Sequence, residues 1–300
     1  MSAGESYVEL APLPGLVDHL RTVWVQTTGT APYLQRHLPT GGAELHWPLG
    51  GEPRLLGPLT GPRVEVIPAS TILLGVRFHP GAPVLIPGGV GDLLDRQVAL
   101  DELGHRWVDR LGEAIATAVT PRAGLLVLQE FLLRRTRTAG GDPLVRAAVR
   151  MLMPWAPREI GVVADHLGLS VSQFRRRSVW AVGTGPKSLQ RTLRFQGFLA
   201  LAQSGTMAAG RRGADGMVGL AVDAGYADQA HLSREVRRLS GLTPAGLLGA
   251  QVDRCSCGHD HTASYAPFLA ARSPEKVQVG GDADHVTVRD SFKTGKRVAR

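Results

Sequence analysis

The sequence predicts an α+β protein of two domains: a β-rich N-terminal domain with helices, then an all-α C-terminal domain with two helix-turn-helix motifs. Three observations predict this class. Short apolar runs broken by Gly and Pro give way after residue 100 to apolar residues at helical spacing. A breaker-rich linker, RTRTAGGDP, coincides with a change in charge balance, and an internal repeat follows it. The expected units are residues 1–138, residues 142–250 and a disordered tail over 252–300.

The N-terminal strands are expected between about Leu20 and Pro87. The runs TVWVQ, AELHWPL, VEVIP and TILLGVRF are short, rich in β-branched residues and bounded by breakers, which is typical of strands in a compact β-domain. Two helices should follow. Trp107, Leu111 and Ile115 recur at helical spacing, and Pro121 occupies a favourable first position for the second helix.

Charge separates the two halves of the chain. Residues 1–141 contain 12 Lys and Arg against 13 Asp and Glu, whereas residues 142–254 contain 15 against 8. A basic second half is typical of a polyanion-binding domain, and also of an ordinary solubilising surface. Asp142 and Pro143 are suited to cap and begin the first helix of this half.

The repeat distinguishes these alternatives. Residues 163–186 and 220–244 each contain an apolar helix ending at a glycine, Gly168 or Gly225, then a capping residue, Ser170 or Asp228. Each continues with an arginine-rich helix and closes on G-x-x-P. A helix, a glycine turn and a second helix form a helix-turn-helix, so two copies are expected.

Each second helix has one apolar face and one basic face. Leu232, Val236 and Leu239 should face inward in the second copy, and Val171, Phe174 and Ala181 in the first. In the first copy a reciprocal capping box is expected between Ser170 and Gln173. The outward residues suit the major groove of duplex DNA, where arginine reads guanine. The residues predicted to contact DNA are Ser172, Arg175, Arg176, Gln229, His231, Ser233, Arg234, Arg237 and Arg238.

This repeat resembles the twin helix-turn-helix domain of the AraC/XylS transcription regulators. The second copy carries GY-x-D-Q from Gly225, a Ser-Arg pair at 233–234 and GLTP at 241–244; the first carries A-x-x-LGLS at 164–170, GTGPK at 183–187 and R-x-x-R at 191–194. More weakly, GVRFHPGAP at 75–83 and the following LLDRQVALDEL resemble cupin-like N-terminal domains found on some of these regulators.

The resemblance implies a long helix over 187–203 that joins the motifs, and an N-terminal domain that binds a small effector or mediates dimerisation. The implied partners are duplex DNA, an unidentified effector, RNA polymerase and a second copy of the chain. One position departs from the family. Where a large aromatic is usual in the first recognition helix, this chain has Ser178, and Trp180 falls on the outer side. Either the helix rotates to bury Trp180 or the first motif is loosely packed.

The tail contains a cluster of cysteines and histidines that could sense a metal ion instead of a small effector. Cys255, Cys257, His259 and His261 lie within seven residues and could hold zinc or copper(I), which would make the chain a metal-responsive regulator. Their alternate spacing wraps a tetrahedral ion poorly, so an incidental cluster is the competing interpretation. If the tail is an appendage, truncation after Arg254 should leave folding unchanged.

No enzyme is expected. The sequence shows no Walker loop, dinucleotide fingerprint or Ser/His/Asp nucleophile context, and no cofactor is predicted. His46 and His79 occur without a His-x-His pair, which favours surface or hydrogen-bonded residues over metal ligands. The N-terminus has no secretory pattern and no apolar run approaches the ~20 residues of a spanning helix, so a cytoplasmic protein without membrane contact is expected.

Overall fold

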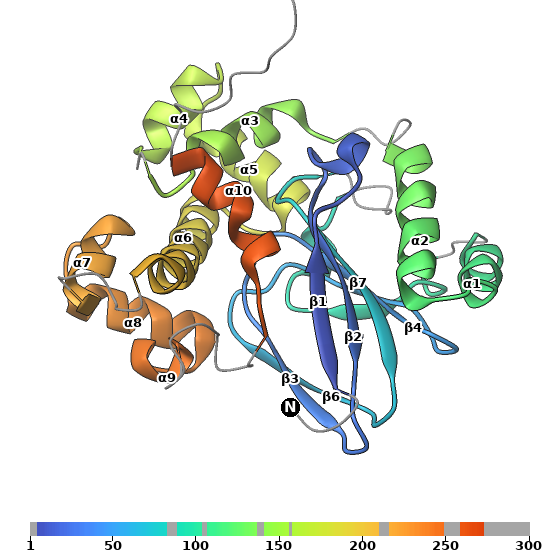
Figure 1. Ribbon diagram of the computed structural model, residues 1–300. Coiled ribbons are helices and arrows are strands. Elements are labelled where there is room, and N and C mark those ends of the chain that lie inside the picture. Colours follow the sequence, from blue (N-terminus) through green and yellow to red (C-terminus); the bar gives the residue numbers. More distant parts are fainter. Residues whose placement is uncertain are drawn as a thin grey trace, which may run out of the picture.

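The chain is an α+β protein with a β-rich N-terminal half and a helical C-terminal half (Figure 1). The computed structural model describes residues 5–82, 89–103, 107–136, 141–155, 158–209, 216–248 and 259–272. The strands are β1 (Ser6–Leu10), β2 (Leu20–Thr27), β3 (Tyr33–His37), β4 (Glu44–Pro48), β5 (Arg54–Leu56), β6 (Arg63–Ile67), β7 (Ile72–Phe78) and β8 (Gln97–Ala99). All four strands expected from the apolar runs are present.

Two antiparallel sheets form the N-terminal half. Six strands pair in the order β1-β2-β7-β4-β5-β8, and β3 pairs with β6 in a separate ribbon. The short 3-10 turns η1 (Pro14–Leu16) and η2 (Gly91–Leu93) connect strands. One face of the large sheet supplies Val23, Leu74 and Val76 to an apolar core. That core is closed by α1 (Val108–Ala116) and α2 (Pro121–Thr136), the two helices expected from the spacing.

The opposite face of the large sheet is also buried, but its side chains are different. Alternate residues of β2, β4 and β7 place Trp24, Glu44, His46 and Arg77 on this face. The ring of Trp24 lies so close over Gly75 that no side chain fits there, which explains a glycine inside a central strand. The space between the sheets is therefore lined by polar and aromatic groups.

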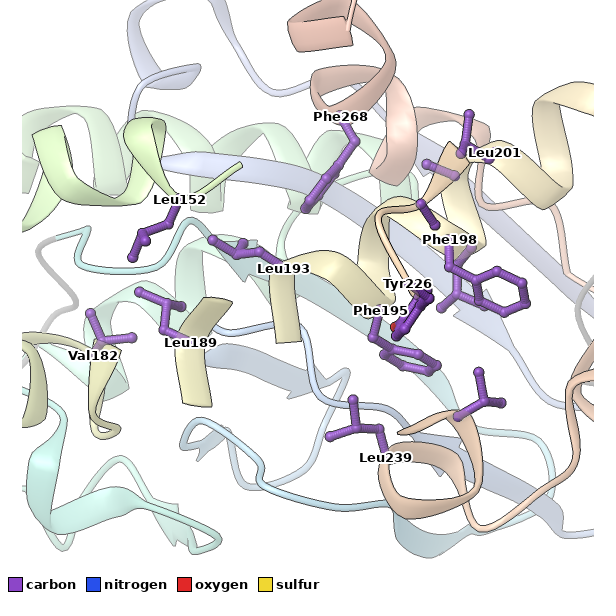
Figure 2. Close-up of a cluster of buried hydrophobic side chains, with 14 of the residues drawn as sticks. Leu152, Val182, Leu189, Leu193, Phe195, Phe198, Leu201, Tyr226, Leu239 and Phe268 are labelled. Atoms are coloured by element: carbon purple, nitrogen blue, oxygen red, sulfur yellow. The ribbon is translucent and has the colours of Figure 1, made fainter. Parts of the chain in front are cut away.

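The C-terminal half is helical. Its elements are α3 (Pro143–Met151), α4 (Ile160–His166), α5 (Val171–Val182), α6 (Pro186–Ala209), α7 (Gly216–Asp223), α8 (Gln229–Ser240), α9 (Pro244–Leu248) and α10 (Thr262–Arg272). Asp142 caps α3 as expected, accepting from Leu144 N and Val145 N. The long helix implied by the family resemblance is α6, and its Leu189, Leu193 and Phe198 lie in the core between the two motifs (Figure 2).

The expectation of a disordered tail fails over residues 262–272. These residues form α10, which lies along β1, β2 and α6 (Figure 1). Tyr265 and Phe268 are buried, and Trp155 Nε1 donates to Phe268 O at 2.6 Å. Local sequence patterns do not predict this helix, because it is short, contains Pro267 and is stabilised by distant partners.

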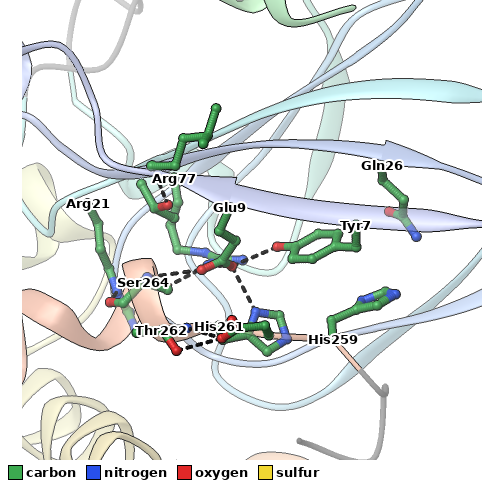
Figure 3. A network of polar contacts seen from close by, with 12 residues as sticks. Tyr7, Glu9, Arg21, Gln26, Arg77, His259, His261, Thr262 and Ser264 are labelled. Atoms are coloured by element: carbon green, nitrogen blue, oxygen red, sulfur yellow. Dashed lines mark hydrogen bonds and ion pairs between the residues drawn. The ribbon is translucent and has the colours of Figure 1, made fainter.

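A polar network fixes α10 to the sheet (Figure 3). Glu9 accepts from Ser264 N at 2.9 Å and contacts His261 Nδ1 at 2.8 Å, while Arg77 Nη1 donates to Ser264 Oγ at 2.7 Å. Arg21 Nε donates to Ser264 O at 2.5 Å. Burial alone would raise the pKa of Glu9, but the hydrogen bond and charge of His261 together with Arg77 lower it to about 2. Glu9 is therefore a buried carboxylate with a complete set of partners.

The two halves of the chain touch at the ends of α5 and α8. A Cβ atom on Gly183 would lie 3.3 Å from Pro58 Cγ, and one on Gly241 would lie 3.4 Å from Pro62 Cγ. Both glycines have positive φ, 80° and 74°, so each position has a conformational need for glycine. The single loop between β5 and β6 thus contacts both helices.

Candidate nucleic-acid interface

The two repeated units have the same local hydrogen bonds. Gly168 and Gly225 have φ of 66° and 77°. In the first unit Leu169 N donates to Ala164 O at 2.9 Å, and in the second Tyr226 N donates to Ala221 O at 2.9 Å. This hydrogen bond, from the N–H of residue i+5 to the C=O of residue i, ends the first helix of each motif in the same way. The repeat seen in the sequence is therefore a repeat of backbone structure.

The second helix of each unit starts at a satisfied cap. Ser170 Oγ accepts from Gln173 N, and Gln173 Oε1 accepts from Ser170 N, which completes the expected capping box. Asp228 accepts from His231 N at 2.6 Å at the start of α8. Both helices end at a left-handed glycine, Gly183 or Gly241. The boundaries of both candidate recognition helices are thus set by residues within each repeat, by a side-chain cap at the start and by a glycine at the end.

The inner face of α8 is as predicted: Leu232, Val236 and Leu239 are buried. In α5 the buried face begins at Phe174, because Val171 at the first helical position is 52% exposed rather than inward. This is a correction to the predicted stripe. The first turn of α5 projects beyond the apolar core of the domain.

The surroundings of Ser178 match neither expectation, that the helix rotates to bury Trp180 or that the first motif is loosely packed. It is fully buried, and its Oγ donates to Thr184 O at 2.8 Å, just beyond the end of the helix. Trp180 stays 49% exposed and packs beside Gly89, where a Cβ atom would lie 3.1 Å from Trp180 Cδ2. The helix has not rotated, and the small residue is accommodated by a hydrogen bond rather than by a loose core.

The predicted DNA-contacting residues divide into exposed groups and groups engaged by the turn. The side chains exposed to solvent are those of Ser172, Arg175, Arg176, Gln229, Arg234, Arg237 and Arg238. His231 and Ser233 are half-buried. The His231 ring stands edge-on to Tyr226 at 5.3 Å, and its Nδ1 lies 3.4 Å from Ala227 N. His231 therefore also supports the turn of its own motif.

On α8 the exposed residues surround one hollow. Ser233, Arg234, Arg237 and Arg238 line an open depression of about 500 Å³ together with Thr243 and Pro244. Within the described residues none of these three arginines forms an ion pair, and the same holds for Arg175 and Arg176. By contrast, Arg177 pairs with Asp142 at 2.6 Å, and Arg191 pairs with Glu235 at 2.8 Å. The charges on the outer faces are thus free for an external anion.

The Cys/His cluster of the tail falls partly outside the described residues, which include neither Cys255 nor Cys257. His261 contacts Glu9, and the His259 ring is stacked on Tyr7 at 4.3 Å with an interplanar angle of 10°. Both imidazoles are thus held against β1. No local sequence pattern predicts these contacts, because the partners lie more than 240 residues away in the chain.

In the N-terminal half, Trp24, Trp47 and Phe78 are buried, and Trp24 also lines a small cavity between the sheet and the C-terminal helices. His79 is largely shielded, with a hydrogen bond to the backbone of Val17, and burial lowers its pKa to about 4. His46 is fully buried between the sheets.

No helix among the described residues has the length and apolar character needed to span a bilayer.

Comparison with known proteins gives a partial family match. The model of a domain of unknown function, DUF6597, matches residues 8–99, which is less than half of the chain. No curated protein matched. The solved structures that match include ToxT from Vibrio cholerae, at 9% identity and a TM-score of 0.41 over 80% of this chain and 96% of that one. ToxT bound to an unsaturated fatty acid matches at 10% identity and a TM-score of 0.41 over 81% and 95% of the two chains. At these identities the likeness concerns the fold alone.

Proposed function

We propose that the chain is a sequence-specific, double-stranded-DNA-binding transcriptional regulator of the AraC/XylS type. The observation that carries this proposal is the structural repeat: two helix-turn-helix units with matching turn bonds and caps, each presenting exposed arginines on the second helix. A single basic helix is a common surface feature. Two such helices in equivalent positions on one helical domain are suited to contact two turns of a duplex.

The free arginines supply both affinity and sequence reading. Each exposed guanidinium can neutralise a phosphate or donate two hydrogen bonds to a guanine edge in the major groove. Ser172, Arg175 and Arg176 lie in the first half of α5, the part of a recognition helix that enters the groove. The end of α5 is unavailable, because Val179 and Trp180 lie against Gly91 and Gly89 of the N-terminal half.

The N-terminal half is proposed to receive the signal. A cavity of about 80 Å³ lies where the large sheet meets α6, α9 and α10, and Gln26, Arg77, Gln196 and Tyr265 are among its lining residues. An effector bound there would contact both halves at once, which is what control of DNA binding requires. RNA polymerase and a second copy of the chain are further proposed partners.

The test is selection of bound duplexes from a random pool with the full chain, followed by binding titrations at fixed salt. A defined motif should emerge, and the variant Arg234→Ala/Arg237→Ala should lose affinity for it. Arg110→Ala, which removes an exposed arginine of α1 in the N-terminal half, is the control and should bind normally. Recovery of no enriched sequence, or equal losses in both variants, would count against the proposal.

A further inference from the structure

The ribbon of β3 and β6 mixes apolar and polar residues on both of its faces. Its outer face carries Leu34, Val64 and Val66, which are 63%, 48% and 63% exposed, beside Arg36. Its inner face carries the buried Ile67 but also His37 and Glu65, which point into the space between the two sheets. Strands of a small sheet normally place apolar residues inside and polar residues outside. A local violation of this rule is expected where function, rather than stability, selects the residues.

Three of the inward groups converge from three strands. His37 of β3, His46 of β4 and Glu65 of β6 each offer one ligand atom, and these atoms lie within 4.8 Å of one another. His37 Nε2 is 3.1 Å from Glu65 Oε2, and the two imidazole rings are stacked with centroids 5.0 Å apart. Both histidines are more than nine-tenths buried, at 7% and 4% exposure.

His46 provides a second, independent observation. Its Nε2 is buried and has no hydrogen-bond partner among the described residues. Glu44 Oε2 lies 3.5 Å away, at the outer limit of a hydrogen bond, and Glu44 is already engaged by Arg77 Nε at 2.8 Å. A buried imidazole nitrogen without a partner is destabilising, and such a group needs an explanation.

We propose that His37, His46 and Glu65 form a binding site for a divalent transition-metal ion, with Zn²⁺ the best fit to the donors. Two imidazoles and one carboxylate are a donor set that zinc accepts, leaving a fourth position for an external ligand. Bonds of about 2.0–2.2 Å place neighbouring donor atoms roughly 3.3–3.5 Å apart, so the most widely separated donors must approach each other by up to about 1.5 Å. This inference does not depend on DNA binding.

The surroundings provide access and a structural consequence. His46 and Glu65 also line an open cavity of about 530 Å³ that reaches the surface beside Gly50, Glu52 and Arg54. An ion could enter through it, and an exogenous ligand could approach the fourth position from it. Because two of the donors belong to the ribbon and one to the large sheet, the bound ion would tie the two sheets together. Metal binding should therefore stabilise the fold by mass action.

The experiment uses the full chain carrying Cys255→Ser and Cys257→Ser, so that tail thiols cannot contribute. Protein stripped of metal with a chelator is titrated with Zn²⁺ by calorimetry, and bound zinc is measured after dialysis. One equivalent should bind and raise the melting temperature. Glu65→Gln and His46→Asn should each weaken binding by more than about 100-fold, since even loss of an outer partner of a metal ligand costs about 10–100-fold. His166→Asn, at an exposed histidine of α4, is the control and should bind zinc normally.

Each outcome decides the proposal. Glu65→Gln keeps the shape of a half-buried side chain, so it tests the site even if His46→Asn fails to fold. Binding of Co²⁺ to the thiol-free chain should give an absorption spectrum of nitrogen and oxygen ligands in the parent and lose it in Glu65→Gln. Folded protein that binds no zinc would overturn the proposal. So would one equivalent of zinc that both variants retain, because the ion would then reside elsewhere, including at His259 and His261.

Discussion

At the scale of the residue, Ser178 is a small, buried, hydrogen-bonded side chain at a position where the first helix-turn-helix motif packs against its core. The corresponding position of the second unit holds Val236, so the site is an inner-face position in both copies. In α5 the hydroxyl bonds Thr184 O, and this bond ties the end of the helix to the chain beyond Gly183. A sequence comparison detects the small residue but cannot detect the bond, because the acceptor is a backbone carbonyl.

Because Ser178 is already tightly packed, Ser178→Phe should destabilise the domain rather than stabilise it. A phenylalanine there would not fill a void; it would overpack a fully buried position and remove the bond to Thr184 O. We expect a loss of about 1–3 kcal/mol in the free energy of unfolding, against about 1 kcal/mol for Ser178→Ala. Urea denaturation of the two variants and the parent measures both. A phenylalanine variant more stable than the parent would show that the site contains unfilled space.

A second residue-scale prediction concerns acid. The pKa of His79 falls from its ordinary 6.5 to about 4, chiefly because of burial and then because of Arg21. Between these values the unfolded chain binds a proton that the folded chain does not, so stability is lost as pH falls from 6.5 towards 4. The full effect is on the order of 3 kcal/mol. His79→Gln should flatten this part of the stability profile in denaturation curves, and an unchanged slope would contradict the assignment.

At the scale of the element, α10 marks the limit of sequence-based prediction. The strands over 22–26 and 71–78 and the helices of both repeats follow from local patterns of apolar residues and caps. Helix α10 does not, because its two buried aromatics and Ser264 contact residues far away in the chain, in the N-terminal half, at Trp155 and in α6. The polar cluster of His37, His46 and Glu65 was missed for the same reason: its members come from three strands that only the fold brings together.

Removal of α10 should therefore destabilise the chain. Truncation after residue 258 exposes the surfaces that Tyr265 and Phe268 cover and leaves buried Glu9 without two of its partners. Loss of a single buried aromatic costs about 3–5 kcal/mol, so the truncated chain should lose at least that much in the free energy of unfolding. Truncation after Arg272, which keeps the helix, is the matched control and should unfold like the full chain. Equal midpoints for both truncations would mean that α10 is dispensable.

At the scale of the whole molecule, several contacts join the two halves of the chain. The loop containing Pro58 and Pro62 contacts the ends of α5 and α8, α10 connects the sheet to α6, and Gln196 Nε2 donates to Pro39 O at 2.8 Å. A change in the N-terminal half can therefore alter how α5 and α8, the two candidate recognition helices, sit relative to each other. This arrangement gives the proposed effector a physical route to DNA, because a ligand acts only through the contacts it changes between two states.

The central claim is that α5 and α8 read separate parts of one DNA site, about one helical turn or ~34 Å apart. The direct measurement is a set of binding titrations of Arg176→Ala and Arg234→Ala on the selected duplex and on duplexes with either half scrambled. Each substitution should cost about 1–3 kcal/mol on the intact site and almost nothing once its own half is scrambled. The two variants should respond to opposite halves. If both respond to the same half, or if neither substitution changes affinity on the intact site, the assignment of α5 and α8 as paired groove-reading helices is contradicted.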